Sequence, residues 1–189
     1  MRAIFSLSNI LSRIAILCGR VGAWAFFPLM LIIMLDVVMR RFFVVGSIRL
    51  QELEWHFHAI LFLFCLGFAY LANAHVRIEL ISERLPDRAR VLIELLGLAI
   101  LMLPLCWILL SYSIDLVLRS YASGESSPHP GGLPYRWIIK AVMPVGFTLL
   151  IVSGVASLLR SIILLFGQPE LREQVIARVA QEARKHGEE

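Results

Sequence analysis

The chain has 189 residues, of which 59% are hydrophobic and 17% are charged, with a formal net charge of +4. Soluble globular domains average about 45–50% apolar and 25% charged residues, so this composition excludes an ordinary soluble domain. Charged residues are absent from four apolar runs, at residues 21–35, 55–74, 95–114 and 141–159. Three of these runs reach roughly 20 residues, the length a helix needs to cross about 30 Å of hydrocarbon.

The sequence therefore predicts an all-α integral membrane protein with four transmembrane helices, at about 14–39, 52–74, 90–121 and 135–166. Together these form a domain over residues 1–166, joined by short interfacial helices and followed by an amphipathic tail helix over 167–189. A soluble bundle would show a polar stripe on each helix, and a barrel would show alternating strands of about ten residues. Neither pattern is present.

The first span reads as an uncleaved anchor rather than a signal peptide. Arg2 and Arg13 precede it, but it ends in Asp36, Arg40 and Arg41 without a small-residue cleavage site. Residues 1–13 are expected to form an interfacial lead-in, and Pro28 is expected to kink the helix.

The connector between the first two spans brings four charged residues close together in sequence. Arg40 and Arg41 end the first span, and Glu52 and Glu54 begin the second, directly before Trp55. We expect these four charges to meet across the connector in a structural ion pair, with Trp55 at the membrane interface.

The connector between the last two spans is dense in turn-forming residues and runs over residues 122–135. Its candidate contact residues continue into the fourth span: Pro128, Gly131, Gly132, Pro134, Arg136 and Trp137. The loop either simply joins two helices or is ordered against a partner protein. Residues 76–90, between spans two and three, alternate charged and apolar positions, which favours a short helix on the membrane surface.

After the fourth span, Gly167 is expected to end the helix and Pro169 to lie in the first turn of the next. Leu171, Val175, Val179 and Ala183 would share one face of this tail helix. The pattern leaves open whether that face docks on protein or lies on the membrane.

The distribution of Lys and Arg predicts the orientation. The N-terminal segment, the second connector and the C-terminal segment carry 12 of these residues, and the other two connectors carry 6. By the positive-inside rule both termini are cytoplasmic. The positive net charge then reflects a membrane surface, and no nucleic-acid partner is expected.

No set of residues indicates catalysis, a metal or a cofactor. His56, His58 and His75 all fall on or beside the second span, whereas bis-histidine haem ligation needs facing helices. The three cysteines are isolated from one another. Glu94 and Asp115 bracket the third span instead of marking its centre, so a substrate path through this chain alone is not expected.

Four segments, in this order around four spans, carry a family resemblance. They lie at residues 40–43 with 50–55, at 66–70 with 75–79 and 85–86, at 124–137, and at 140 with 144–147. In these the chain resembles the DctQ-type small membrane subunit of tripartite ATP-independent periplasmic (TRAP) transporters, over roughly residues 14–166.

The resemblance implies a subunit of a complex in the bacterial inner membrane. Its partners would be the lipid bilayer, a large permease subunit and a periplasmic substrate-binding protein. The large subunit would move an organic acid inward, driven by a coupling ion, commonly sodium, that binds there and not here. The small subunit would act as a scaffold. The alternative is a membrane-anchor subunit of a respiratory or other multi-subunit complex.

Overall fold

The computed structural model describes residues 1–72 and 86–187. Within them every regular element is helical, in the order α1 (Arg2–Ala23), α2 (Phe26–Phe42), α3 (Ile48–Leu71), α5 (Asp87–Leu96), η1 (Gly97–Met102), α6 (Leu103–Ala122), α7 (Trp137–Phe166) and α8 (Pro169–Gly187). The expected surface helix over 76–90 and His75 fall largely or wholly outside these residues.

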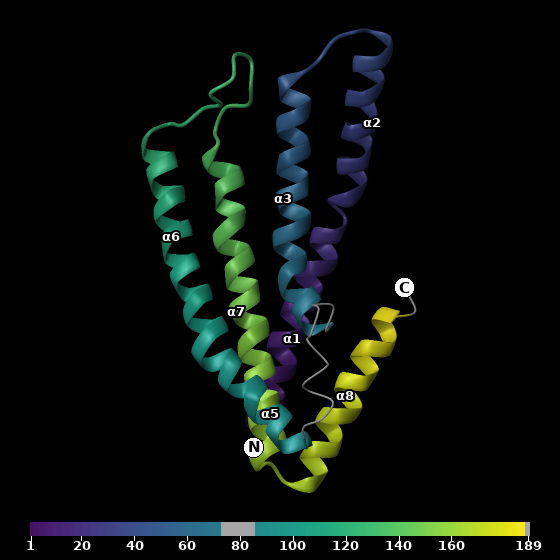
Figure 1. The fold of residues 1–189 in the computed structure, drawn as a ribbon, viewed down its shortest axis with the longest axis vertical. Coiled ribbons are helices and arrows are strands. Elements are labelled where there is room, and N and C mark those ends of the chain that lie inside the picture. Colours follow the sequence, from purple (N-terminus) through teal and green to yellow (C-terminus); the bar gives the residue numbers. More distant parts are fainter. Residues whose placement is uncertain (73–85, 188–189) are drawn as a thin grey trace.

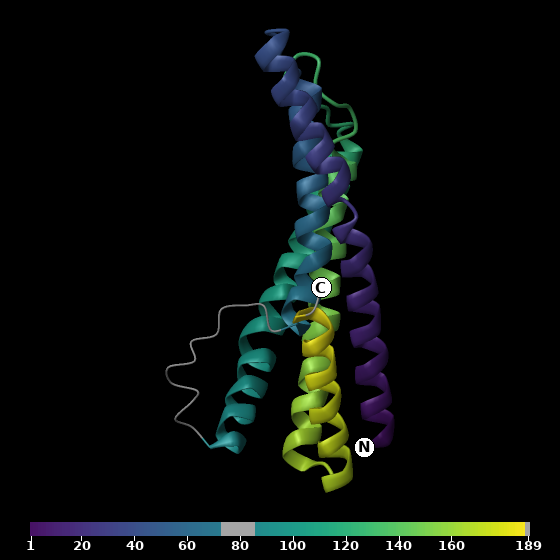
Figure 2. The same ribbon diagram turned by 90° about the vertical axis from the view of Figure 1, so that its right-hand side faces the viewer.

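Four helical segments in the described chain are long and apolar enough to cross a membrane: Arg2–Phe42, Ile48–Leu71, Arg88–Ala122 and Trp137–Phe166. This confirms the all-α membrane fold with four spans. The helices stand side by side in an elongated bundle (Figures 1 and 2). One end, here called the loop end, carries the α2–α3 and α6–α7 connectors. The other, the termini end, carries the start of α1, α5 and α8 (Figure 1).

Two of the spans are interrupted beside a proline. The first divides at Trp24–Ala25, where the N–H groups of Ala25 and Phe27 bond three residues back instead of four. Pro28 lies just beyond and has no N–H to continue the ladder. In the third span the π-helical segment η1 directly precedes Pro104, which cannot donate to the carbonyl of Ile100. A wider turn before a proline accommodates that missing bond.

Small residues let the helices approach closely. The buried face of α1 is made only of small side chains, namely Ser8, Ser12, Ala15, Gly19 and Gly22. A Cβ added at Gly67 of α3 would lie 2.8 Å from the carbonyl oxygen of Leu149 in α7. This packing by small residues is typical of helices in lipid, where burying apolar surface gains little and backbone proximity gains dispersion contacts.

At the termini end, α8 folds back and packs on α7 and α1 (Figure 1). Gly167 turns the chain and donates its N–H to the carbonyl of Ile163 at 2.7 Å. Ile163, Leu171 and Val175 form a buried cluster, with Ile4, Phe5, Leu164 and Val179 packed against it. Of the two alternatives for the tail helix, the structure therefore shows the docked one. Residues 1–13 are part of α1 and help to receive it.

Candidate subunit-contact site at the loop end

The first candidate residue, Glu52, lies one turn into α3. Ser47 caps this helix, its Oγ accepting from the N–H of Leu50 at 3.4 Å. Helix α3 therefore begins at Ile48, and Glu52 is directed toward the loop between α6 and α7. The Glu52 residue is 7% exposed, so its carboxylate needs partners there.

Both Glu52 oxygens are bonded to that loop. Leu133 N–H donates to Oε2 at 2.5 Å, and the Ser127 hydroxyl donates to Oε1. Ser127 N–H also donates to the Leu133 carbonyl at 3.2 Å, so the loop closes on itself around the carboxylate. One turn earlier on α3, Arg49 Nε donates to the Gly131 carbonyl at 2.9 Å. We call this set the loop latch: Arg49, Glu52, Ser127, Gly131 and Leu133.

The loop latch explains the two adjacent glycines. Gly131 has φ +80°, a backbone conformation that glycine adopts without steric cost. At Gly132 an added Cβ would collide with the Ser127 side chain and lie 2.9 Å from Glu52 Oε1. These positions therefore need glycine for two different reasons, one conformational and one spatial.

A second tie fixes the base of the same loop. Glu125 Oε2 accepts from Ser120 Oγ at 2.7 Å and forms an ion pair with Lys140. Its backbone carbonyl accepts from the Arg136 N–H at 3.0 Å. The Lys140 ammonium, followed by the Ser120 hydroxyl, lowers the pKa of Glu125 below its ordinary value, so the tie is ionised at neutral pH. The loop thus obtains its shape from α3, α6 and α7 of its own chain.

The expected meeting of Arg40 and Arg41 with Glu52 is wrong. Arg40 instead forms an ion pair with Asp36, four residues earlier on α2. Glu52 and Glu54, two residues apart on a helix, point about 200° apart and cannot share a partner. Glu54 is the one that faces α2, where it lines an open groove together with Asp36, Arg40 and Arg41.

The remaining candidates lie around the loop latch. Trp55 and Arg136 line a cavity of about 220 Å³ beside Glu52. Trp137 packs edge-to-face on Tyr121, with ring centroids 5.4 Å apart, which joins the ends of α6 and α7. Pro128 and Pro134 are exposed on the loop surface.

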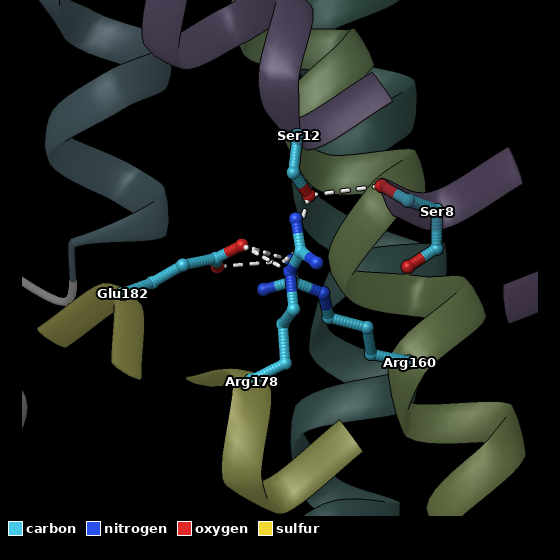
Figure 3. A network of polar contacts seen from close by, with 5 residues as sticks. All are labelled: Ser8, Ser12, Arg160, Arg178 and Glu182. Atoms are coloured by element: carbon cyan, nitrogen blue, oxygen red, sulfur yellow. Dashed lines mark hydrogen bonds and ion pairs between the residues drawn. The ribbon is translucent and has the colours of Figure 1, made fainter. Parts of the chain in front are cut away.

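A further polar cluster lies at the termini end, which the sequence analysis did not single out. Arg160 of α7 is 7% exposed and donates to Ser12 Oγ of α1 at 2.9 Å. It also forms an ion pair with Glu182 of α8 at 2.9 Å, and Arg178 reaches the same carboxylate at 3.4 Å (Figure 3). The Ser12 hydroxyl in turn donates to the Ser8 carbonyl. The sequence does contain a signal for this cluster. Arg160 interrupts an apolar run, and Ser8 and Ser12 lie four residues apart on one face of α1.

None of this assembles a reactive centre in the described residues. They contain no group of three or more His, Cys, Asp or Glu side chains placed to hold a metal ion. His56 Nδ1 donates to the Glu52 carbonyl of its own helix at 2.5 Å. The buried Glu52 holds the loop and the buried Arg160 joins α1, α7 and α8, whereas the buried Asp36 pairs with Arg40 of its own helix.

Fold and site together define a class, namely a four-span helical membrane protein whose polar groups tie its own elements together. Comparison with known families then gives a specific result. Residues 29–164 match the family described as tripartite ATP-independent periplasmic transporters, DctQ component. The match covers more than half of the chain, and the chain belongs to this family. It is the small membrane subunit of a TRAP transporter, as the resemblance implied. No curated protein and no solved structure matches it.

Proposed function

We propose that this chain is the static scaffold of the large permease in an ion-gradient-driven, binding-protein-dependent uptake system for an organic acid. It would lie in the bacterial inner membrane with both termini cytoplasmic. The permease would hold the substrate and the coupling ion, which the family resemblance gives as sodium, and the periplasmic binding protein would deliver the substrate. The family membership does not support the alternative, a membrane anchor of a respiratory or other multi-subunit complex.

The observation that carries the scaffold proposal is the place of the buried charges. Among the described residues, the buried charged side chains are Asp36, Glu52 and Arg160, and each lies nearer in sequence to an end of its membrane-spanning helix than to the middle. Asp36 and Glu52 lie toward the loop end, and Arg160 lies toward the termini end. Between them, α3 and α7 touch at Gly67 and Gly146 with backbone-level contacts. A translocation site would place charged groups near the bilayer centre.

Orientation is part of the proposal. Twelve Lys and Arg residues accompany the termini and the second connector, and six accompany the loop-end connectors. The termini end would then be cytoplasmic, and the loop latch periplasmic, on the side where a substrate-binding protein docks.

Assembly provides the test. A tagged copy of this chain, expressed with its cognate large permease, should retain that permease through purification in mild detergent. The matched control is an unrelated four-span protein carrying the same tag. Recovery of the permease with the control alone, or with neither chain, would contradict the scaffold function.

A further inference from the structure

A groove between α2 and α3 at the loop end contains two charged residues, Arg41 and Glu54, that form no ion pair within the described residues. It has a volume of about 520 Å³ and is lined by Ile33, Asp36, Val37, Arg40, Arg41 and Glu54. The Asp36 side chain is 4% exposed; Arg40 holds its Oδ2, but its buried Oδ1 has no hydrogen-bond partner among the described residues. A buried carboxylate oxygen is stabilised by a hydrogen-bond donor, and a bound partner can supply one.

The connector beyond this groove exposes an apolar tip. Phe42, Phe43, Val44 and Val45, here called the connector tip, are 75%, 64%, 88% and 52% exposed. They follow Arg40 and Arg41 and therefore lie past the charges that end the first span. Four successive exposed apolar residues beside two arginines offer a partner both apolar and charged groups to contact.

The backbone of the connector tip is strained. Val44 has φ +53°, in the left-handed region that a β-branched residue rarely adopts. The turn brings the Val45 N–H to the Met39 carbonyl at 3.3 Å. Glycine would make the same turn without strain, so valine here gives up stability in exchange for an outward apolar side chain.

The arrangement of this surface selects its occupant. It runs without a break from Ile33 and Val37, in the apolar part of α2, past Asp36, Arg41 and Glu54 to the connector tip. Lipid tails cannot satisfy the charges, and the buried Asp36 Oδ1 calls for a donor in a fixed position, which a protein side chain provides more readily than a mobile lipid headgroup. Helix α2 packs mainly on α3 and stands at the edge of the bundle, away from α6 (Figure 1). A membrane-embedded protein with apolar surface and charged partners fits every part of it.

We propose that the α2–α3 groove and the connector tip together form the docking surface for the large permease. This inference rests on the proposed function, because it names the face through which the scaffold acts. The permease would donate a hydrogen bond to Asp36 Oδ1, pair with Arg41 and Glu54, and cover Val44 and its neighbours.

Val44→Gly separates docking from folding. It removes the strain, so the isolated subunit should melt at the same temperature as the wild type or higher. It also removes an apolar side chain that the permease would cover, so retention of the permease should fall about tenfold. The control variant is Ile108→Ala, at a half-exposed position of α6, away from the proposed docking surface. Alanine is used because glycine would destabilise the interior of that helix. This variant should leave retention of the permease unchanged.

Photo-crosslinking residues at Val37, Val44 and Ile108 locate the contact directly in the assembled complex. Positions 37 and 44 should give permease adducts, and position 108 should not. If the wild-type chain retains the permease but adducts form only from position 108, or only with lipid at 37 and 44, this docking face is wrong and the scaffold function stands. If the wild-type chain retains no permease, both proposals fall.

Discussion

At the residue scale, Glu52 is the side chain on which the loop depends. It is buried and accepts from a backbone N–H and a hydroxyl of the segment 127–133. Ser47 fixes the start of α3 and thereby the direction of Glu52. A single carboxylate thus connects the second span to the connector between the third and fourth.

Glu52→Ala should lower the free energy of unfolding by about 1–3 kcal/mol, because it leaves the Leu133 N–H and the Ser127 hydroxyl without their acceptor. Thermal unfolding of the purified subunit in detergent measures this. Glu54→Ala is the matched control, since Glu54 is bonded to nothing in the described chain and should change stability by less than about 0.5 kcal/mol. Equal melting temperatures for wild type and Glu52→Ala would mean that the latch does not hold the loop.

The residue scale also shows what sequence reasoning can and cannot find. Glu52 was singled out from its place at the start of a span, but its partners lie 75 and 81 residues away and no local spacing points to them. The prediction that Arg40 meets Glu52 is wrong, although Asp36 lies four residues before Arg40, a spacing at which oppositely charged helical side chains meet. The local spacing alone therefore favours Asp36 over the distant Glu52 as the partner of Arg40.

At the element scale, α3 and α7 approach each other closely at Gly67. Gly67→Ala should destabilise the bundle by about 1–3 kcal/mol, because the new Cβ would press on the Leu149 carbonyl and the Ser153 hydroxyl, which are backbone or fixed atoms. Gly97→Ala, where nothing lies within 4 Å of the added Cβ, should be neutral. If the Gly67→Ala variant has the same melting temperature as the Gly97→Ala variant, the helices pack more loosely than described.

The docking of α8 depends on a pair buried between helices. Arg160 and Glu182 have side chains 8% and 16% exposed, so removing one partner leaves a charge poorly solvated. Arg160→Gln should cost about 3–5 kcal/mol. In a double-mutant cycle with Glu182→Gln, the two effects should be clearly non-additive. Additive effects would indicate that each residue acts through separate contacts, and α8 would then be held by Leu171 and Val175 alone.

The helical elements themselves follow from the sequence because charge-free runs of such length have few other stable environments. Their ends are harder to predict. Helix α3 begins four residues before the expected position because Ser47 caps it, and α1 begins at Arg2 rather than at the membrane boundary. The face formed by Leu171, Val175 and Val179 was evident from its spacing. That it docks could not be known, because its receiving surface is assembled from α1 and α7.

At the scale of the whole molecule, the orientation remains a prediction. Because Lys and Arg divide twelve to six, reporter fusions at Asp87 and after Glu189 should report cytoplasmic, and a fusion at Gly124 should report periplasmic. A phosphatase and a fluorescent reporter, active on opposite sides, read this out in the same cells. Phosphatase activity from the Asp87 fusion would reverse the orientation and place the loop latch in the cytoplasm.

The central claim is that this chain supports transport without performing it, and uptake into proteoliposomes tests that claim most directly. The complete system, with permease, binding protein and a sodium gradient, should accumulate the organic acid that the binding protein captures. This chain reconstituted alone should give no uptake above empty liposomes, and leaving it out of the complete system should abolish or strongly reduce uptake. Uptake by the isolated chain, or undiminished uptake without it, would contradict the account.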